Sequence, residues 1–222
     1  MEQREYWNQV SATKEFTTPF QMAEFEKYVG KNATILDVGC GYGRTLCELH
    51  ELGFCHLVGI DFSEGMIERG RAQSPYLDLR VQESEKIDFP DESVDAVVLF
   101  AVLTCIRENT SQKALLREIK RVLKPGGILY VNDFLLNEDE RNKKRYAEFA
   151  SQYGTYGIFE LPEGAICRHH EEAWILELLS EFATLKYEHL IFTTMNGNRS
   201  NGFYFIGRKG FGISLWKSSS HN

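Results

Sequence analysis

Short runs of apolar and β-branched residues alternate with segments whose apolar side chains recur at helical spacing through the middle of the chain. The short runs predict five strands, over residues 34–38, 56–61, 78–83, 93–103 and 128–134. The segments between them predict helices, over residues 44–52, 64–72 and 111–127. Strands that alternate with helices form βαβ units, whose right-handed crossovers produce a parallel sheet buried on both faces. The pattern therefore predicts a doubly wound α/β fold.

The pattern changes after residue 134. A polar stretch and then an aromatic, glycine-rich one, together residues 135–170, interrupt the alternation. A helix over 171–182 and two β-rich runs over 184–196 and 202–209 follow, and the turn-rich segment between those runs indicates an antiparallel hairpin. With the five parallel strands, this hairpin predicts a seven-stranded mixed sheet that is mostly parallel and has an antiparallel C-terminal strand.

The composition is that of an ordinary globular protein, with 43% hydrophobic residues, 26% charged residues and a formal net charge of −7 over 222 residues. It contains no strong basic stripe, so generic binding to nucleic acid or to an anionic membrane is not expected. No apolar run approaches the roughly 20 residues of a membrane span, and the N-terminus lacks the apolar segment of a signal peptide. The five cysteines include no CxxC pair, which favours reduced thiols in the cytoplasm over a disulfide framework or a zinc site.

The first predicted strand ends in a glycine-rich turn that follows an acid. Gly39, Gly41 and Gly43 come directly after Asp37 and the end of the strand. Glycines let a ligand approach backbone N–H groups because no Cβ intervenes. The spacing is G-x-G-x-G, not the G-x-G-x-x-G of dinucleotide folds, and the Lys-Ser/Thr of a P-loop is missing. A cationic ligand without phosphate, such as S-adenosylmethionine with its sulfonium and amino groups, would explain the acid.

Acidic residues also end the next two predicted strands. Asp61, at the end of the second, is placed to accept hydrogen bonds from both hydroxyls of a ribose. Glu83 and Ser84 end the third strand, where a carboxylate could accept a hydrogen bond from an adenine amino group. A nucleoside at the carboxyl ends of the strands is therefore expected.

Four successive segments resemble the motifs of Rossmann-like (class I) S-adenosylmethionine-dependent methyltransferases. They are "ILDVGCGYG" (35–43), "VGIDFSEGMIE" (58–68), "VQESEKIDFPDESVDAVV" (81–98) and "LKPGGILYV" (123–131). The resemblance covers residues 33–134 tightly and weakens in the flanks. The fold of this family is a seven-stranded sheet with a reversed last strand, in agreement with the hydrophobic pattern.

The resemblance implies S-adenosylmethionine as the cofactor and S-adenosylhomocysteine as the product. It places the glycine turn at the methionine end of the cofactor, Asp61 at the ribose and the last residues of the fourth strand beneath the cofactor. The implied cofactor residues are Asp37, Gly39, Cys40, Gly41, Gly43, Asp61, Phe62, Met66, Glu83, Ser84, Phe100 and Ala101. Thr104 and Cys105 stand where many relatives have a histidine.

The flanks are expected to select the substrate. The resemblance implies a single domain over residues 1–215, with a helical N-terminal cap over about 1–30 and an insertion over about 135–170; residues 216–222 are expected to be a flexible tail. Candidate substrate residues are Tyr6, Trp7, Tyr146, Tyr153 and Arg168. The aromatic ones are alternatively packing residues, and the insertion is either a lid or an ordinary helix-and-loop segment.

Two adjacent histidines are candidate catalytic residues. His169 or His170 could act as a general base near neutral pH. The alternative, which we favour, is that both only begin the helix over 171–182 and face solvent. The mixed charges of residues 137–145 indicate a solvated helix face, and no cluster of residues suggests a metal site.

The sequence therefore predicts a methyltransferase with a small-molecule acceptor. The fourth strand ends in "LFAVLT", without the Asn/Asp-Pro-Pro-aromatic signature of many nucleic acid and protein methyltransferases, and no proline precedes Cys105 as in cytosine-5 enzymes. The alternatives are an acceptor in protein or RNA, a catalytically silent module that binds the cofactor, and an NAD(P)-dependent oxidoreductase. No feature of the sequence specifies the acceptor atom or the oligomeric state.

Overall fold

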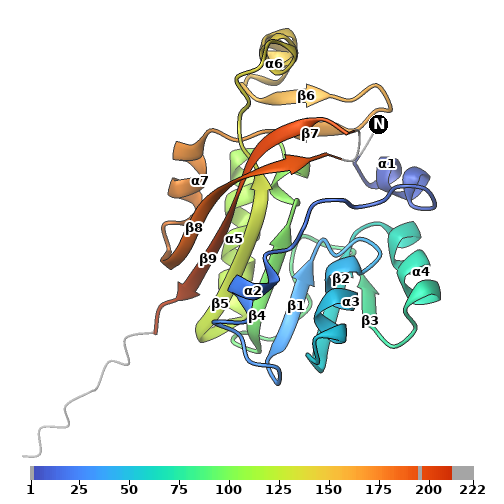
Figure 1. The fold of residues 1–222 in the computed structure, drawn as a ribbon, viewed down its shortest axis with the longest axis vertical. Coiled ribbons are helices and arrows are strands. Elements are labelled where there is room, and N and C mark those ends of the chain that lie inside the picture. The colour runs from blue at the N-terminus through green and yellow to red at the C-terminus, as the bar shows by residue number, and fades with distance from the viewer. Residues whose placement is uncertain (1–2, 195–196, 212–222) are drawn as a thin grey trace, which may run out of the picture.

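The computed structural model describes residues 3–194 and 197–211, and the predicted tail over 216–222 lies outside them. A seven-stranded sheet has the order β3-β2-β1-β4-β5-β9-β8 (Figure 1). Its strands are β1 Thr34–Val38, β2 His56–Asp61, β3 Asp78–Val81, β4 Val94–Phe100, β5 Leu123–Phe134, β8 Phe182–Thr193 and β9 Arg199–Lys209. Strands β1 to β5 pair in parallel, and β9 runs antiparallel between β5 and β8. The predicted fold class is confirmed.

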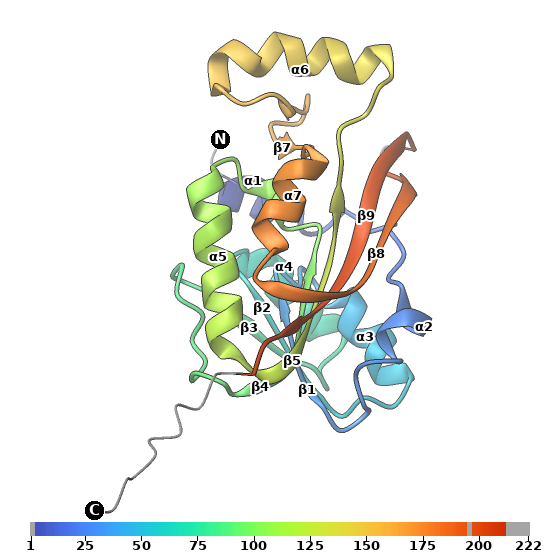
Figure 2. The same ribbon diagram turned by 90° about the vertical axis from the view of Figure 1, so that its left-hand side faces the viewer.

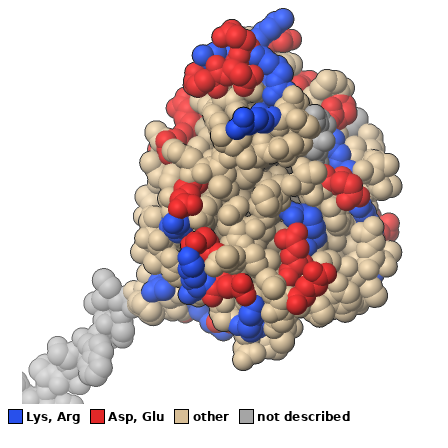
Figure 3. All heavy atoms as spheres, in the orientation of Figure 1, with Lys and Arg blue, Asp and Glu red and all other residues tan. Residues whose placement is uncertain are grey.

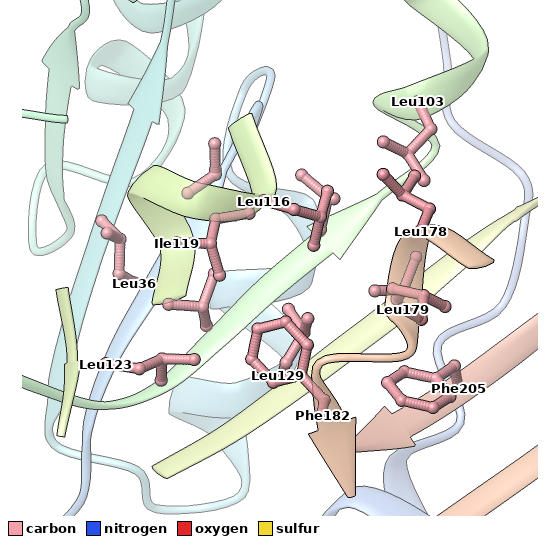
Figure 4. Close-up of a cluster of buried hydrophobic side chains, with 14 of the residues drawn as sticks. Leu36, Leu103, Leu116, Ile119, Leu123, Leu129, Leu178, Leu179, Phe182 and Phe205 are labelled. Atoms are coloured by element: carbon pink, nitrogen blue, oxygen red, sulfur yellow. The ribbon is translucent and has the colours of Figure 1, made fainter. Parts of the chain in front are cut away.

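Helices cover both faces of the sheet (Figure 2). They are α2 Met22–Phe25, α3 Arg44–Glu51, α4 Glu64–Gln73, α5 Asn109–Val122 and α7 Glu172–Leu179. On one face, Ile119 of α5 and Leu178 of α7 share a buried cluster with Leu129 of β5 (Figure 4). On the other face, Phe25 of α2 and Leu46 of α3 belong to a second buried cluster. The continuous apolar runs of the central strands follow from this burial on both sides.

Several element boundaries differ from the predictions, among them the end of β4 at Phe100 rather than at residue 103 and the end of α7 at Leu179 rather than at residue 182. Strand β3 ends at Val81, so Glu83 and Ser84 lie in the loop after it. Helix α5 ends at Val122 rather than at residue 127. The reason is Pro125, which lacks an N–H and disfavours the helical conformation of the residue before it, so the chain joins β5 early.

Two segments lie beyond the carboxyl ends of the parallel strands (Figures 1 and 2). The N-terminal segment contains α1, Gln3–Val10, and leads to α2. The second follows β5 and contains α6, Glu140–Tyr153, and the antiparallel pair β6, Ile158–Glu160, and β7, Ile166–Arg168. We call residues 135–170 the insertion. Open α/β sheets bind ligands at this end of their strands.

No helix in the described part of the chain is both long and apolar enough to cross a membrane.

Candidate active site

A cavity of about 910 Å³ lies at the carboxyl ends of the parallel strands. We call the part lined by Asp37, Asp61 and Glu83 its cofactor end and the part lined by the insertion its insertion end. The N-terminal segment contributes Tyr6, Trp7 and other residues to the wall. All the predicted cofactor residues except Gly43 line this cavity.

Gly43 has a conformational role instead. It begins α3 with a left-handed backbone, φ +85°, and a Cβ there would lie 3.2 Å from the side chain of Leu77. Glycine is therefore needed for the turn and for close packing of α3, and not for contact with the cavity.

The other two glycines bring the backbone of the turn to the cavity wall. Gly39 and Gly41 have φ values of +74° and +55°. The N–H groups of Gly39 and Cys40 donate to the carbonyl oxygen of Ile60 at 2.8 and 3.1 Å, which ties the turn to β2. A Cβ on Gly41 would clash with Phe16 of the N-terminal segment. The N-terminal segment thus packs directly on the turn.

Asp61 joins the turn to the start of α4. One carboxylate oxygen accepts from the N–H of Gly41 and the other from the N–H of Ser63, both at 2.8 Å. Burial raises the pKa of Asp61, and these two hydrogen bonds act against that rise. Each carboxylate oxygen can accept a further hydrogen bond, so the group is fixed in place and still able to accept from a ligand.

Asp37 is the least satisfied polar group at the cofactor end. Its Oδ1 is buried and has no hydrogen-bond partner. Burial, and then the nearby Asp61, raise the pKa of Asp37 to about 7, while Arg44 acts in the opposite direction. A buried carboxylate oxygen without a donor is costly. A ligand with an amino group or a cationic centre would remove that cost, so this end fits the expected cofactor.

The backbone is strained at Ala101, directly after the end of β4. Ala101 has a left-handed φ of +55°, which is unfavourable for a residue with a Cβ. Its N–H donates to the carbonyl oxygen of Asn132 at 2.7 Å, which holds the strained turn against β5. Phe100 and Ala101 both line the cavity.

The sequence did not identify Gln82 and Val102, which also line the cavity.

The predicted substrate residues divide into three groups. Tyr6 and Trp7 line the cavity. Tyr146 is fully buried behind the wall. Tyr153 and Arg168 do not line the cavity: Tyr153 donates to Glu160 on the outside of the insertion, and Arg168 packs beside a tryptophan ring and donates to a backbone carbonyl. The structure therefore places Tyr153 and Arg168 outside the lining of this cavity.

Both histidines are buried, so the expectation that they face solvent is wrong. His170 lies between Gln112 of α5, whose Nε2 is 2.9 Å from its Nε2, and the carbonyl oxygen of Phe134, 3.1 Å from its Nδ1. Burial lowers the pKa of His170 to about 3 and that of His169 well below its usual range. His169 lines the cavity and His170 does not. Neither has the near-neutral pKa that a base role requires.

The insertion contributes cavity residues that the sequence did not identify. They are Arg141, Arg145, Phe159, Leu161, Ala165 and Cys167. The charged run over 137–145 is not simply a solvated helix face, because Asn137 and Asn142 are buried. The signal in the sequence was the aromatic, glycine-rich character of the insertion, which suggested a lid but made none of these six residues a candidate.

Three cysteine thiols line the cavity. Burial raises the pKa of the thiols of Cys40, Cys105 and Cys167, so they are protonated at neutral pH. Among residues 3–194 and 197–211, no group of three or more His, Cys, Asp or Glu side chains is placed to hold a metal ion.

Comparisons with known proteins agree with the geometry. The family described as "Methyltransferase domain" matches residues 36–131. The chain is 35% identical over 135 residues to a sterol 24-C-methyltransferase of Eremothecium gossypii, covering 54% of this chain and 35% of that protein. It is 32% identical over 126 residues to tRNA N(3)-cytidine methyltransferase METTL2 of Mus musculus, covering 49% of this chain and 31% of that protein. In both cases the chain spans less than two thirds of the curated relative.

Solved structures are similar over most of the chain. A SAM-dependent methyltransferase from Methanosarcina mazei superimposes with a TM-score of 0.81 and 26% sequence identity. The match covers 87% of this chain and 99% of that one. The similarity therefore includes the flanks, where the sequence resemblance is weak.

Proposed function

Because the chain belongs to the Rossmann-like S-adenosylmethionine-dependent methyltransferases, we propose that it transfers a methyl group from S-adenosylmethionine to a small molecule. One observation carries the proposal: the cavity has both a cofactor end and an insertion end within about 910 Å³. Ligand pockets of about 300–1,000 Å³ hold small molecules. The covering N-terminal segment and insertion favour an acceptor that is enclosed.

The cofactor supplies an electrophilic methyl group on a sulfonium. On this proposal Asp37 accepts from its amino group, Asp61 accepts from the ribose hydroxyls, and Glu83 and Ser84 lie at the adenine. Phe62 and Met66 flank the adenine ring. The hydrogen bond that Met66 donates to Ser63 Oγ, 3.2 Å long, begins α4 and fixes this part of the wall.

The chain's own contribution to catalysis is alignment and exclusion of water. Methyl transfer is an in-line displacement, which is accelerated when the nucleophile is held at about 3 Å from the methyl carbon. The insertion and Trp7 line the cavity together with the cofactor end, so they would surround an acceptor bound beside the cofactor. Excluding water strengthens the electrostatic interactions inside and prevents side reactions.

A macromolecular acceptor is the second candidate, because a relative named for tRNA methylation is among the matches. The surface favours it less. Lysine, arginine, aspartate and glutamate side chains are interspersed on the face in Figure 3, and the net charge is −7. Binding to nucleic acid depends on clustered positive charge.

The cytoplasm remains the proposed location, since all five cysteines are free.

Methyl-tritiated S-adenosylmethionine separates these candidates. The protein is incubated with the labelled cofactor and a cell extract, which is then separated into small molecules, protein and RNA. We expect label in the small-molecule fraction, dependent on the protein. Label confined to protein or RNA contradicts the proposal, and tight cofactor binding without any incorporation favours a silent binding module.

A further inference from the structure

We propose that the insertion end binds the carboxylate of an acceptor with an apolar or aromatic body, through the guanidinium of Arg145 and the Nε2–H of His169. This inference rests on the proposed function and names the chemical class of the acceptor. It is argued from the surroundings of the Arg145 guanidinium and the His169 imidazole, which favour binding of an anion.

Arg145 is a cation of the cavity wall that packs on aromatic rings. It lies on α6, lines the cavity, and its guanidinium carbon is 3.4 Å from the ring centre of Phe159. Its Nε is buried and has no hydrogen-bond partner. Within the described residues no aspartate or glutamate forms an ion pair with it, whereas the cavity residues Lys14 and Arg141 pair with Glu163 and Asp139.

This arrangement is costly while the cavity holds no anion. Burial lowers the pKa of Arg145, and the neighbouring Tyr146 acts in the opposite direction. A partly buried charge needs a partner. The planar guanidinium matches the two oxygens of a carboxylate and can bind both at once.

His169 lines the cavity, and its hydrogen-bond partners decide which ring nitrogen carries the hydrogen. Its Nδ1 lies 3.1 Å from Nδ2 of Asn137 and 2.6 Å from the hydroxyl of Tyr146. The orientation of Asn137 is fixed, because its Oδ1 accepts from the N–H of Asn201 and its Nδ2 donates to the carbonyl of Leu135. Nδ2 also lies 3.0 Å from Oγ of Ser200, so Asn137 alone does not assign the role of Nδ1. The hydroxyl of Tyr146 accepts from the N–H of Asn137 at 3.3 Å and has its own hydrogen left for Nδ1, so Nδ1 accepts.

With Nδ1 as the acceptor, the neutral ring of His169 carries its hydrogen on Nε2. The ring cannot rotate freely, since it stacks on Phe134 with centres 5.5 Å apart and meets Phe159 edge-on at 4.9 Å. The imidazole is thus held as a donor, and not as the base that the sequence suggested.

In the part of the chain that the structure describes, the insertion end of the cavity is lined by cations and by no carboxylate, whereas the rest of the cavity is lined by both signs of charge. Acidic lining residues come from the strand ends, the loop after β3 and α5, namely Asp37, Asp61, Glu83, Glu85 and Glu118. The described lining residues between Phe134 and His169 include no carboxylate, and their charged members are Arg141 and Arg145. Their apolar members, such as Phe159 and Leu161, suit an apolar or aromatic body. The insertion end therefore favours an anion.

The test uses the full chain saturated with S-adenosylhomocysteine. Isothermal titration measures binding of phenylacetate, 3-phenylpropionate and indole-3-acetate, each beside its neutral amide and beside phenyl phosphate. We expect at least one carboxylate to bind, and to bind at least about 10-fold more tightly than its amide, as expected for hydrogen bonds to a charged group. Equal affinity for the amide, tighter binding of phenyl phosphate, or no carboxylate binding overturns the inference.

Matched variants assign the effect to the two residues. Arg145→Met should remove the preference for carboxylate, while Arg141→Met, one turn earlier on α6 and paired with Asp139, should keep most of it. His169→Gln, which retains a donor, should keep more of the preference than His169→Phe. An unchanged preference in Arg145→Met contradicts the assignment. The affinity for S-adenosylhomocysteine is measured on every sample. If the wild type does not bind S-adenosylhomocysteine, the proposed function is contradicted. If it binds S-adenosylhomocysteine but shows no preference for carboxylates, only this inference is contradicted.

Discussion

The carboxylate of Asp61 accepts a hydrogen bond from the N–H of Gly41 at 2.8 Å and so joins the end of β2 to the glycine turn after β1. One side chain therefore shapes the turn and remains able to accept from a ligand. The cofactor end depends on this link, because the turn that it fixes also supports Phe16 and the N-terminal segment.

Replacing Asp61 should weaken cofactor binding strongly. Asp61→Ala removes the acceptor for the Gly41 and Ser63 N–H groups and for the proposed ribose contact, so we expect affinity for S-adenosylhomocysteine to fall at least about 10- to 100-fold. Isothermal titration measures this. Asp78→Ala, an exposed carboxylate paired with Arg80 at the start of β3, is the control and should leave affinity unchanged. Equal affinity in Asp61→Ala and wild type would refute the ribose role.

Binding of S-adenosylmethionine should tighten as pH rises through the pKa of Asp37, about 7. The ionised carboxylate attracts the cationic ligand, so affinity should increase up to about 10-fold between roughly pH 6 and pH 8. Asp37→Asn should remove most of this dependence. Asp133→Asn is the control, because burial also raises the pKa of Asp133 to about 7 but this residue does not line the cavity. A flat profile in the wild type contradicts the prediction.

The raised pKa of Asp37 also affects the stability of the ligand-free protein. The folded protein holds the proton more tightly than the unfolded chain, so this group stabilises the fold fully below about pH 4 and loses that contribution as pH rises through about 7. Urea unfolding of the wild type and Asp37→Asn at several pH values should show the difference in unfolding free energy changing within this window. A constant difference would be evidence against the buried, unpaired carboxylate.

His170 should have the opposite effect. In the folded protein the pKa of His170 is lowered to about 3, whereas in the unfolded chain it is about 6.5. As pH decreases below about 6.5, the imidazole is therefore protonated in the unfolded chain before it is in the folded protein, and the free energy of unfolding falls. Relative to His170→Gln, the wild type should lose up to about 1.4 kcal/mol of unfolding free energy per pH unit in this range. The same difference measured above pH 7 should be constant and serves as the internal control. No pH dependence below 6.5 would contradict a neutral buried imidazole.

Gly41→Ala should open the N-terminal segment. The added Cβ clashes with Phe16, and the left-handed φ of +55° disfavours any side chain. We expect lower stability and faster proteolysis before α2. Phe16→Ala in the same chain should relieve the clash, so the double variant should lose less stability than the sum of the single changes. Additive losses would mean that Phe16 does not lie on the turn.

The fold was predictable because its signals are local. The short β-rich run over 56–61 is a strand in the structure, and the helical pattern after it is a helix that begins directly after Ser63, whose hydroxyl accepts from the N–H of Met66. The glycine turn and its acid were equally visible. Boundaries were less predictable: the end of α5, for example, followed from Pro125, which helical periodicity alone does not take into account.

The insertion end was not predictable, because its residues acquire their roles through distant contacts. Arg145 lies in a charged run, and only the packing of α6 against β6 places its guanidinium on Phe159. His169 is next to His170 in sequence, yet one lines the cavity and the other joins β5 to α5. Composition therefore suggested solvent exposure where tertiary structure produces burial.

A crystal structure of the complex with S-adenosylhomocysteine tests the central claim most directly. The account predicts the amino group of the ligand at Asp37, its ribose at Asp61, and an open space between its sulfur and the pair Arg145 and His169. A ligand bound outside the cavity, or inside it with the adenosine at the insertion end, would contradict the account.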